Sequence, residues 1–263
     1  MTLRPLALAL GLSAPLLAAA AERVVDVPTR PGVTVRLLLV DPDGPPRAAV
    51  VLLAGGHGGL RIGPDGRIEW GKRNFLVRAR ARFAAEGLLA AVVDAPSDRL
   101  HDPFLQGFRD RRDHATDLGA VIQWLRREAK VPVWLVGTSR GTVSAAFAAV
   151  AHAGTPESPD GIVLTSTILD DRHDVAVPDL DLGRLRVPVL LVHHAEDECR
   201  VCPPAFLPHV ERKLGATRHE TVLVSGGTTE GDRCEAVAHH GFNGNEADVV
   251  AAVARFVLAP AGR

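Results

Sequence analysis

Short apolar runs alternate with helix-forming stretches along almost the whole of the 263-residue chain, and this alternation restricts the fold more than any other feature. The run 48–54 is continuously apolar, as in strands that are covered on both faces. A later stretch instead carries Leu118, Ile122 and Leu125, which fall on one face of a helix. Strands that alternate with helices in this way form a mainly parallel sheet with helices on both faces.

This pattern predicts eight strands and five helices. The expected strands cover residues 24–29, 33–40, 48–54, 88–93, 131–136, 161–165, 187–193 and 220–224, of which the first two form a hairpin. The expected helices cover residues 74–86, 113–127, 142–152, 204–214 and 246–258. With 46% hydrophobic residues and no internal repeat or linker, residues 22–263 are expected to form one α/β domain.

The charge balance and the aromatic content argue against two classes of partner. Thirty Lys and Arg residues stand against 31 Asp and Glu residues, for a formal net charge of -1, and no block of like charge stands out. Such a surface does not attract nucleic acid or an anionic membrane. Aromatic residues make up 4% of the chain and tyrosine is missing, so a base-stacking platform is not expected either.

Residues 1–21 have the pattern of a secretory signal peptide. Arg4 supplies a positive start, residues 5–17 are almost wholly apolar, and four alanines precede the charged Glu22. The alternative is a buried or membrane-anchoring helix, but the segment is short for a span and contains prolines and a glycine. The segment predicts export to the periplasm or outside the cell, with no stable membrane insertion after cleavage.

The pentapeptide 137–141, Gly-Thr-Ser-Arg-Gly, stands between the expected strand 131–136 and the expected helix 142–152. A tight turn from strand to helix holds the central serine in a strained backbone conformation and projects its hydroxyl above the sheet. Glycine two residues before and after the serine avoids steric clash in such a turn. The pattern in this context predicts that Ser139 is a nucleophile.

The strand, serine turn and helix just described, together with the order of the later strands and of the residues that follow them, resemble the α/β-hydrolase family. The resemblance covers essentially the whole mature chain. In that family the nucleophile follows the fifth strand, the acid follows the seventh and the histidine follows the eighth. Here residues 193–197 read His-His-Ala-Glu-Asp after the seventh expected strand, and residues 239–242 read His-His-Gly-Phe between the last strand and the last helix. The resemblance implies an α/β-hydrolase fold with a mainly parallel eight-stranded sheet.

The resemblance also implies which carboxylate and which histidine serve the serine. The family's acid lies a few residues past the end of the seventh strand, which favours Asp197 and leaves Glu196 as the alternative. Family members that read His-Gly-Phe point to His240 as the base, with His239 as the alternative. A histidine takes and returns a proton near neutral pH, and a carboxylate on its other nitrogen fixes its tautomer.

Backbone N–H groups are expected to stabilise the oxyanion that forms when the serine attacks. One donor is the N–H of Arg140, directly after the nucleophile, and the second comes from the glycine-rich loop after the third strand. Ala54 stands where the family usually has a histidine, so Gly56 and His57 remain rival donors. The same loop lacks the spacing of a dinucleotide or phosphate loop, and no cofactor or bound metal is expected.

The three cysteines are candidates for oxidation in an exported protein. Cys199 and Cys202 have a C-x-x-C spacing, but a redox motif is less favoured than a structural disulfide. A zinc site made from Cys199, Cys202, Cys234 and His239 is a further alternative. Resemblance to exported hydrolases with a cysteine just past the acid and another ahead of His-Gly-Phe implies a bond between Cys199 and Cys234, with Cys202 free.

The sequence therefore predicts an exported serine hydrolase that cleaves a small-molecule ester through an acyl-enzyme. A peptidase or amidase with the same triad is one alternative, and a catalytically silent relative that acts as a binding protein is another. About twenty residues separate the sixth and seventh strands, too few for a large helical cap. The loops 60–73 and 97–112 are expected to wall the site, with three apolar candidates, Trp70, Phe104 and Phe108, and three candidates for binding an anion, Arg61, Arg99 and Arg109.

Overall fold

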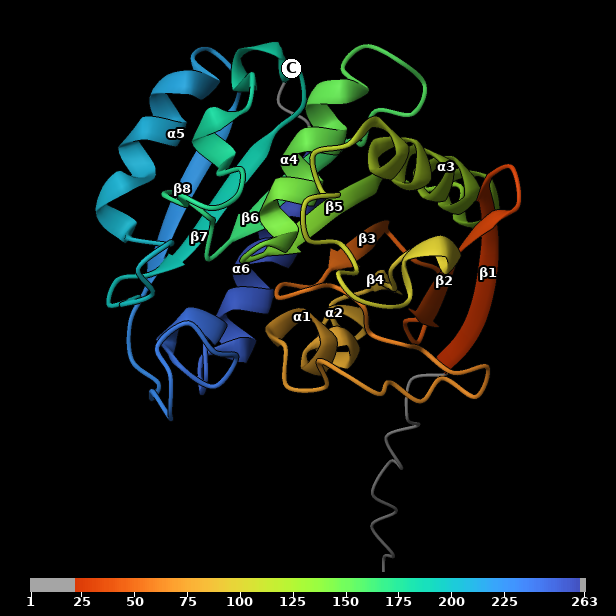
Figure 1. Cartoon of the computed structure of the whole chain (residues 1–263), viewed down its shortest axis with the longest axis horizontal. Helices are drawn as coiled ribbons and strands as arrows, with labels where there is room; N and C mark the ends of the chain where they lie inside the picture. Colours follow the sequence, from red (N-terminus) through yellow and green to blue (C-terminus); the bar gives the residue numbers. More distant parts are fainter. Residues whose placement is uncertain (1–21, 261–263) are drawn as a thin grey trace, which may run out of the picture.

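A computed structural model describes residues 22–260, which form an α/β sandwich around one sheet (Figure 1). The sheet has eight strands in the order β1-β2-β4-β3-β5-β6-β7-β8. The first two pairings, β1 with β2 and β2 with β4, are antiparallel, and the remaining pairs are parallel. The predicted mainly parallel eight-stranded sheet is confirmed, whereas the predicted signal peptide lies outside the described residues.

The strands and helices follow the order expected from the sequence. The strands are β1 Glu22–Arg30, β2 Val33–Val40, β3 Ala48–Leu53, β4 Leu88–Val93, β5 Val133–Thr138, β6 Gly161–Thr165, β7 Val189–His194 and β8 His219–Val224. The helices are α1 Phe75–Arg78, α2 Arg80–Ala85, α3 Arg112–Ala129, α4 Gly141–Ala151, α5 Leu207–Leu214 and α6 Glu246–Leu258. None of these helices is long and apolar enough to cross a membrane.

The central strands are apolar throughout because both of their faces are covered. In β3, Ala49, Val51 and Leu53 face the core formed with α3, α4 and α5. The alternate residues Val50 and Leu52 face the second core, formed with α1, α2 and α6. Since successive side chains of a strand point to opposite faces, a continuous apolar run is what a strand between two helical layers requires.

Two segments differ from the expected elements. The expected helix 74–86 is divided at Ala79, where the Arg82 N–H donates to the Ala79 carbonyl three residues back and tightens the turn. The expected helix 204–214 starts with the 3₁₀ turn η4 Pro204–Phe206 before α5. Between β6 and β7 the chain forms two further 3₁₀ turns, η2 Val177–Asp179 and η3 Leu182–Arg184, and no helical cap, as the short connection predicted.

Candidate active site

Ser139 occupies the sharp turn between β5 and α4. Its φ angle is +52°, in the left-handed region that is strained for a residue with a side chain. Its N–H donates to the Thr165 carbonyl at 3.0 Å, which ties the turn to the end of β6. Backbone strain of this kind persists only where the surrounding structure holds it, and it concentrates at functional sites.

The two glycines of the turn allow the close approach that the strained serine requires. A Cβ atom on Gly137 would lie 2.3 Å from the Gly141 carbonyl oxygen, and one on Gly141 would lie 2.0 Å from the Leu53 carbonyl oxygen. Both contacts are with backbone, which cannot move aside as a flexible side chain does. The glycine requirement inferred from the sequence is therefore met by the packing of the turn against β3 and α4.

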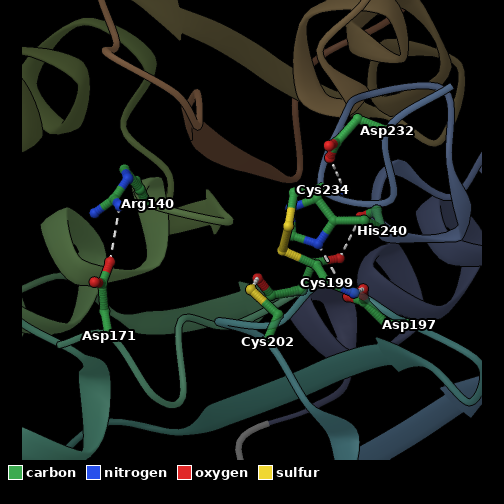
Figure 2. The surroundings of a disulfide bond; sticks show 9 residues. Arg140, Asp171, Asp197, Cys199, Cys202, Asp232, Cys234 and His240 are labelled. Atoms are coloured by element: carbon green, nitrogen blue, oxygen red, sulfur yellow. Dashed lines mark hydrogen bonds and ion pairs between the residues drawn. A yellow bond between two sulfur atoms is a disulfide. The ribbon is translucent and has the colours of Figure 1, made fainter. Parts of the chain in front are cut away.

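His240 and Asp197 form a buried pair beside this turn. His240 lies in the 3₁₀ turn η5 His239–Gly241, and its Nδ1 is 3.0 Å from Asp197 Oδ2 (Figure 2). The other oxygen, Asp197 Oδ1, accepts the N–H of Cys199 at 2.9 Å. The carboxylate is thus held on both of its oxygens, and it fixes the orientation of the His240 ring.

The two alternatives from the sequence lie elsewhere. Glu196 has an exposed side chain, and the ring of His239 stacks on that of His194 with 4.2 Å between centroids. The geometry therefore joins Asp197 to His240, and not Glu196 or His239, although the catalytic roles themselves stay predictions. No hydrogen bond between the Ser139 hydroxyl and His240 is present among the described residues. Catalytic bonds of this kind often tighten only when substrate binds.

Ser139 and His240 line the same cavity, which has a volume of about 480 Å³. The cavity runs between the loop that carries Trp70 and the loop that carries Cys234. Gly55 and Gly56 form the wall next to Ser139. The arrangement places a hydroxyl, an imidazole and a glycine-rich backbone around one space that is large enough for a small organic molecule.

The glycine-rich loop after β3 supplies the candidate oxyanion donors. A Cβ atom on Gly55 would lie 2.9 Å from Ser139 Cβ, so this part of the loop abuts the serine. Gly56 lines the cavity, whereas the His57 ring packs between Trp70 and Phe104, at centroid distances of 3.8 and 4.3 Å. Of the two rival donors, Gly56 is the one that lines the cavity, and the choice between their N–H groups stays a prediction.

Arg140, the other expected donor residue, is anchored through its side chain. The guanidinium pairs with Asp171 at 2.8 Å (Figure 2). It also pairs with Asp174 at 3.3 Å. Burial opposes ionisation of Asp171, but the His173 N–H and the Arg140 guanidinium keep the pKa of this carboxyl below its usual range. The ion pairs connect the start of α4 to the segment after β6, and they hold Arg140 in place next to Ser139.

The walls of the cavity differ from the sequence expectation. Trp70 lines the cavity, but Phe104 and Phe108 are buried and lie outside its lining. Arg109 is buried too, so it does not face an incoming anion. These three residues belong to a long loop without helical or strand periodicity, and the sequence alone did not reveal that the loop folds inward under the site.

Two polar residues that support the site were missed in the sequence. The Asp94 carboxylate accepts the backbone N–H groups of Leu60, Arg61 and Ile62, at 2.7 to 3.1 Å, and so fixes the loop that follows the candidate oxyanion donors. The Ser166 hydroxyl donates to the His240 carbonyl at 2.6 Å. Asp94 directly follows β4 and Ser166 directly follows β6, and a polar residue at the end of a buried strand is the signal that identifies both.

Cys199 and Cys234 are joined by a disulfide, and Cys202 is free (Figure 2). The bond connects the segment after Asp197 to the segment before His240. The predicted pairing is therefore present, and a zinc site that uses both of these sulfurs is not formed. The Cys202 thiol is buried and donates to the Ser166 carbonyl at 3.3 Å, and burial raises its pKa well above the ordinary value. Such a thiol has little thiolate character and is chemically inert.

The disulfide closes a separation of 35 residues, and its removal is expected to destabilise the protein. The chain-entropy model gives a loss on the order of 3 to 4 kcal/mol for a loop of this length. Denaturant unfolding with and without a dithiol reductant measures it. The wild type should lose stability on reduction, the Cys199→Ser/Cys234→Ser variant should start at the lower value, and the matched Cys202→Ser variant should behave as wild type. A Cys202→Ser variant that no longer responds to reductant would show that Cys202 is in the bond.

Solved structures share this fold at low sequence identity. A dienelactone hydrolase from Anabaena variabilis matches with a TM-score of 0.61 at 17% identity, over 90% of this chain and 97% of that one. An α/β serine hydrolase without lid from Xanthomonas campestris matches with a TM-score of 0.56 at 16% identity, over 95% and 100%. A puromycin-hydrolysing peptidase from Mycobacterium tuberculosis matches with a TM-score of 0.63 at 15% identity, over 92% of this chain but 40% of that one. No protein-family model matches the chain, and neither does any curated protein.

The strand order, the helical layers and these structural likenesses define the class: the chain has the α/β-hydrolase fold. At such identities the likeness concerns the fold alone. It also does not choose a substrate, because one of the similar proteins is described as a dienelactone hydrolase and another as a peptidase. The activity has to be argued from the site.

Proposed function

We propose that this protein is an exported serine hydrolase that cleaves a small-molecule carboxylic ester through an acyl-enzyme intermediate. The observation that carries the proposal is the meeting of three features at one cavity. Ser139 lines it from a strained turn, His240 lines it from the opposite loop, and Asp197 binds the far side of the His240 ring. This is the arrangement that activates a serine hydroxyl, which is a poor nucleophile on its own.

In the proposed reaction, the Ser139 oxygen attacks the ester carbonyl while His240 takes the hydroxyl proton. The Asp197 carboxylate holds Nδ1 of the ring, so that Nε2 is the nitrogen available to the serine. The negative charge that develops on the carbonyl oxygen is stabilised by the N–H groups of Arg140 and of Gly56 or His57. His240 then returns the proton to the departing alcohol, and a water molecule releases the acid from Ser139 by the same steps.

We favour an ester over an amide as the substrate because an alcohol and an amine differ as leaving groups. An amine must be protonated before it leaves, which requires close placement of His240 against it, whereas an alcohol leaves more readily. A peptidase or amidase with the same three residues remains the alternative within enzymes. A binding protein that has kept the fold without turnover is the alternative outside them. Export rests on residues 1–21, whose sequence has the signal-peptide pattern.

The mature protein, residues 22–263, should react with a fluorophosphonate probe at Ser139 and should turn over simple esters. Labelling followed by peptide mapping separates an enzyme from a binding protein. A screen of acyl esters of graded chain length, lactones and aminoacyl amides separates an esterase from a peptidase. Absence of both labelling and turnover in folded protein would refute the proposal, and turnover of amides alone would replace the esterase with the peptidase.

A further inference from the structure

Arg109 is a charged side chain enclosed under the candidate active site. It lies in the segment before α3 and is 5% exposed. Its Nη2 donates to the carbonyl oxygens of Ala54 at 3.0 Å and of Gly56 at 3.2 Å, and its Nη1 donates to the Ser144 hydroxyl at 2.8 Å. One guanidinium therefore binds the loop after β3 and the helix α4 at the same time.

The two carbonyl groups belong to the loop that carries the candidate oxyanion donors. Ala54 and Gly56 flank Gly55, the residue that abuts Ser139. A peptide group is planar and contains the carbonyl of one residue and the N–H of the next, so holding the Ala54 and Gly56 carbonyls fixes the N–H groups of Gly55 and His57. These two fixed peptides stand on either side of the one that carries the Gly56 N–H. Glycine residues leave this loop with the greatest conformational freedom of any residue type, so some other group has to fix it. Arg109 does so from the side of the loop that faces the interior.

A second hydrogen bond orients Ser144, which accepts the hydrogen bond from Arg109. The Ser144 hydroxyl lies 2.9 Å from Nε2 of His114, which is fully enclosed. Burial, together with the nearby Arg109 and Arg30 charges, lowers the pKa of His114 to about 3, so its ring is neutral. A neutral imidazole has one N–H and one bare nitrogen, so the contact is a hydrogen bond in either tautomer, with the Ser144 hydroxyl or the Nε2–H as donor. In both cases the Ser144 oxygen can also accept from Arg109. Arg109, Ser144 and His114 are thus joined by two consecutive hydrogen bonds.

Arg109 makes these contacts without a carboxylate partner among the described residues. Burial, with a contribution from Arg140, lowers its pKa to about 9, and the guanidinium still carries its charge at neutral pH. Enclosing an unpaired charge opposes folding, and an apolar residue would fill the same space at less cost. Departures from the ordinary rules of burial concentrate at functional sites.

We propose that Arg109 is a positioning residue for the oxyanion hole. It holds the Ala54–Gly56 backbone in the conformation in which the loop stabilises the transition state. The inference rests on the proposed hydrolase function and assigns a new residue to its machinery. Arg109 does not touch the substrate. It acts through the loop, and its positive charge lies behind the position where negative charge develops in the reaction.

The test compares Arg109→Met and Arg109→Lys with wild type on a short-chain aryl ester. The methionine variant keeps the bulk and loses the donors, and kcat should fall roughly 100-fold with KM within about threefold, since the oxyanion hole acts on the transition state. Affinity for a trifluoromethyl ketone, which forms a tetrahedral adduct with a serine, should fall by a similar factor. The lysine variant keeps the charge and some donors and should recover part of the loss. Arg111→Met, at an exposed arginine two residues along, should behave as wild type.

A folded Arg109→Met variant with wild-type kcat and ketone affinity would overturn the inference. So would a loss of activity that only follows the fraction of folded protein, with no selective effect on kcat or on ketone binding. Where the methionine variant does not fold, the lysine variant carries the same comparison. An inactive wild type would instead refute the proposed function, and the inference with it.

Discussion

Replacing Ser139 with alanine is expected to abolish ester turnover while leaving the protein folded. Removal of the nucleophile from a triad lowers kcat on the order of 10⁴- to 10⁶-fold, because the remaining groups have no acyl acceptor to activate. The side chain contributes little to packing, so the free energy of unfolding should change by about 0.5 kcal/mol or less. Steady-state turnover and denaturant unfolding measure the two effects on the same preparation.

The matched control is Ser225→Ala, at an exposed serine just after β8. It should retain wild-type turnover and should still react with a fluorophosphonate probe, whereas Ser139→Ala should not be labelled. A folded Ser139→Ala variant with substantial esterase activity would place the nucleophile at another residue. In that case the strained turn between β5 and α4 would need a different explanation.

The sequence predicted the sheet because its central strands are covered on both faces. Runs such as 48–54 have no polar residue to allow a solvent-facing side, which restricts them to a strand between two helical layers. The resemblance to the α/β-hydrolase family then implied that Ser139, Asp197 and His240 follow the fifth, seventh and eighth strands, at the carboxyl end of the sheet. Carboxyl ends of parallel strands meet at that end, so residues far apart in the chain come together.

Neighbouring candidates were harder to separate by sequence. Glu196 precedes Asp197, and His239 precedes His240, so an error of one residue in where a strand ends exchanges them. In the structure the difference is large, since Asp197 and His240 are buried against each other while Glu196 is exposed. Packing of the two loops, which the disulfide links, brings Asp197 against His240 and leaves His240, and not His239, in the lining of the cavity.

The sequence could not predict which residues of the long loops are buried. Residues in the loop 97–111 show no helical or strand period, and nothing in their order indicates that Phe104, Phe108 and Arg109 turn inward. An arginine in a loop is ordinarily exposed, and only the fold reveals that Arg109 binds the carbonyls of the loop after β3. Long-range contacts of this kind are absent from local sequence patterns.

The second large effect is expected at His240. His240→Ala should lower kcat by a factor comparable to that of Ser139→Ala, because it removes the imidazole that pairs with Asp197 and lines the cavity beside the serine. Loss of the ring also leaves a buried carboxylate without its partner, at a cost of about 1 to 3 kcal/mol in stability. His240→Gln keeps a polar side chain of similar size and serves as the variant in which folding is least disturbed.

His239→Ala is the matched control, one residue away in the same turn. Its ring stacks on His194 and lies outside the cavity lining, so turnover should stay within a few-fold of wild type. The rate of fluorophosphonate labelling at Ser139 gives a second measurement, since it also depends on the base: it should fall in both His240 variants and not in His239→Ala. If His239→Ala is inactive and the His240 variants are active, the base is His239, and the pairing of His240 with Asp197 serves only to hold the loop.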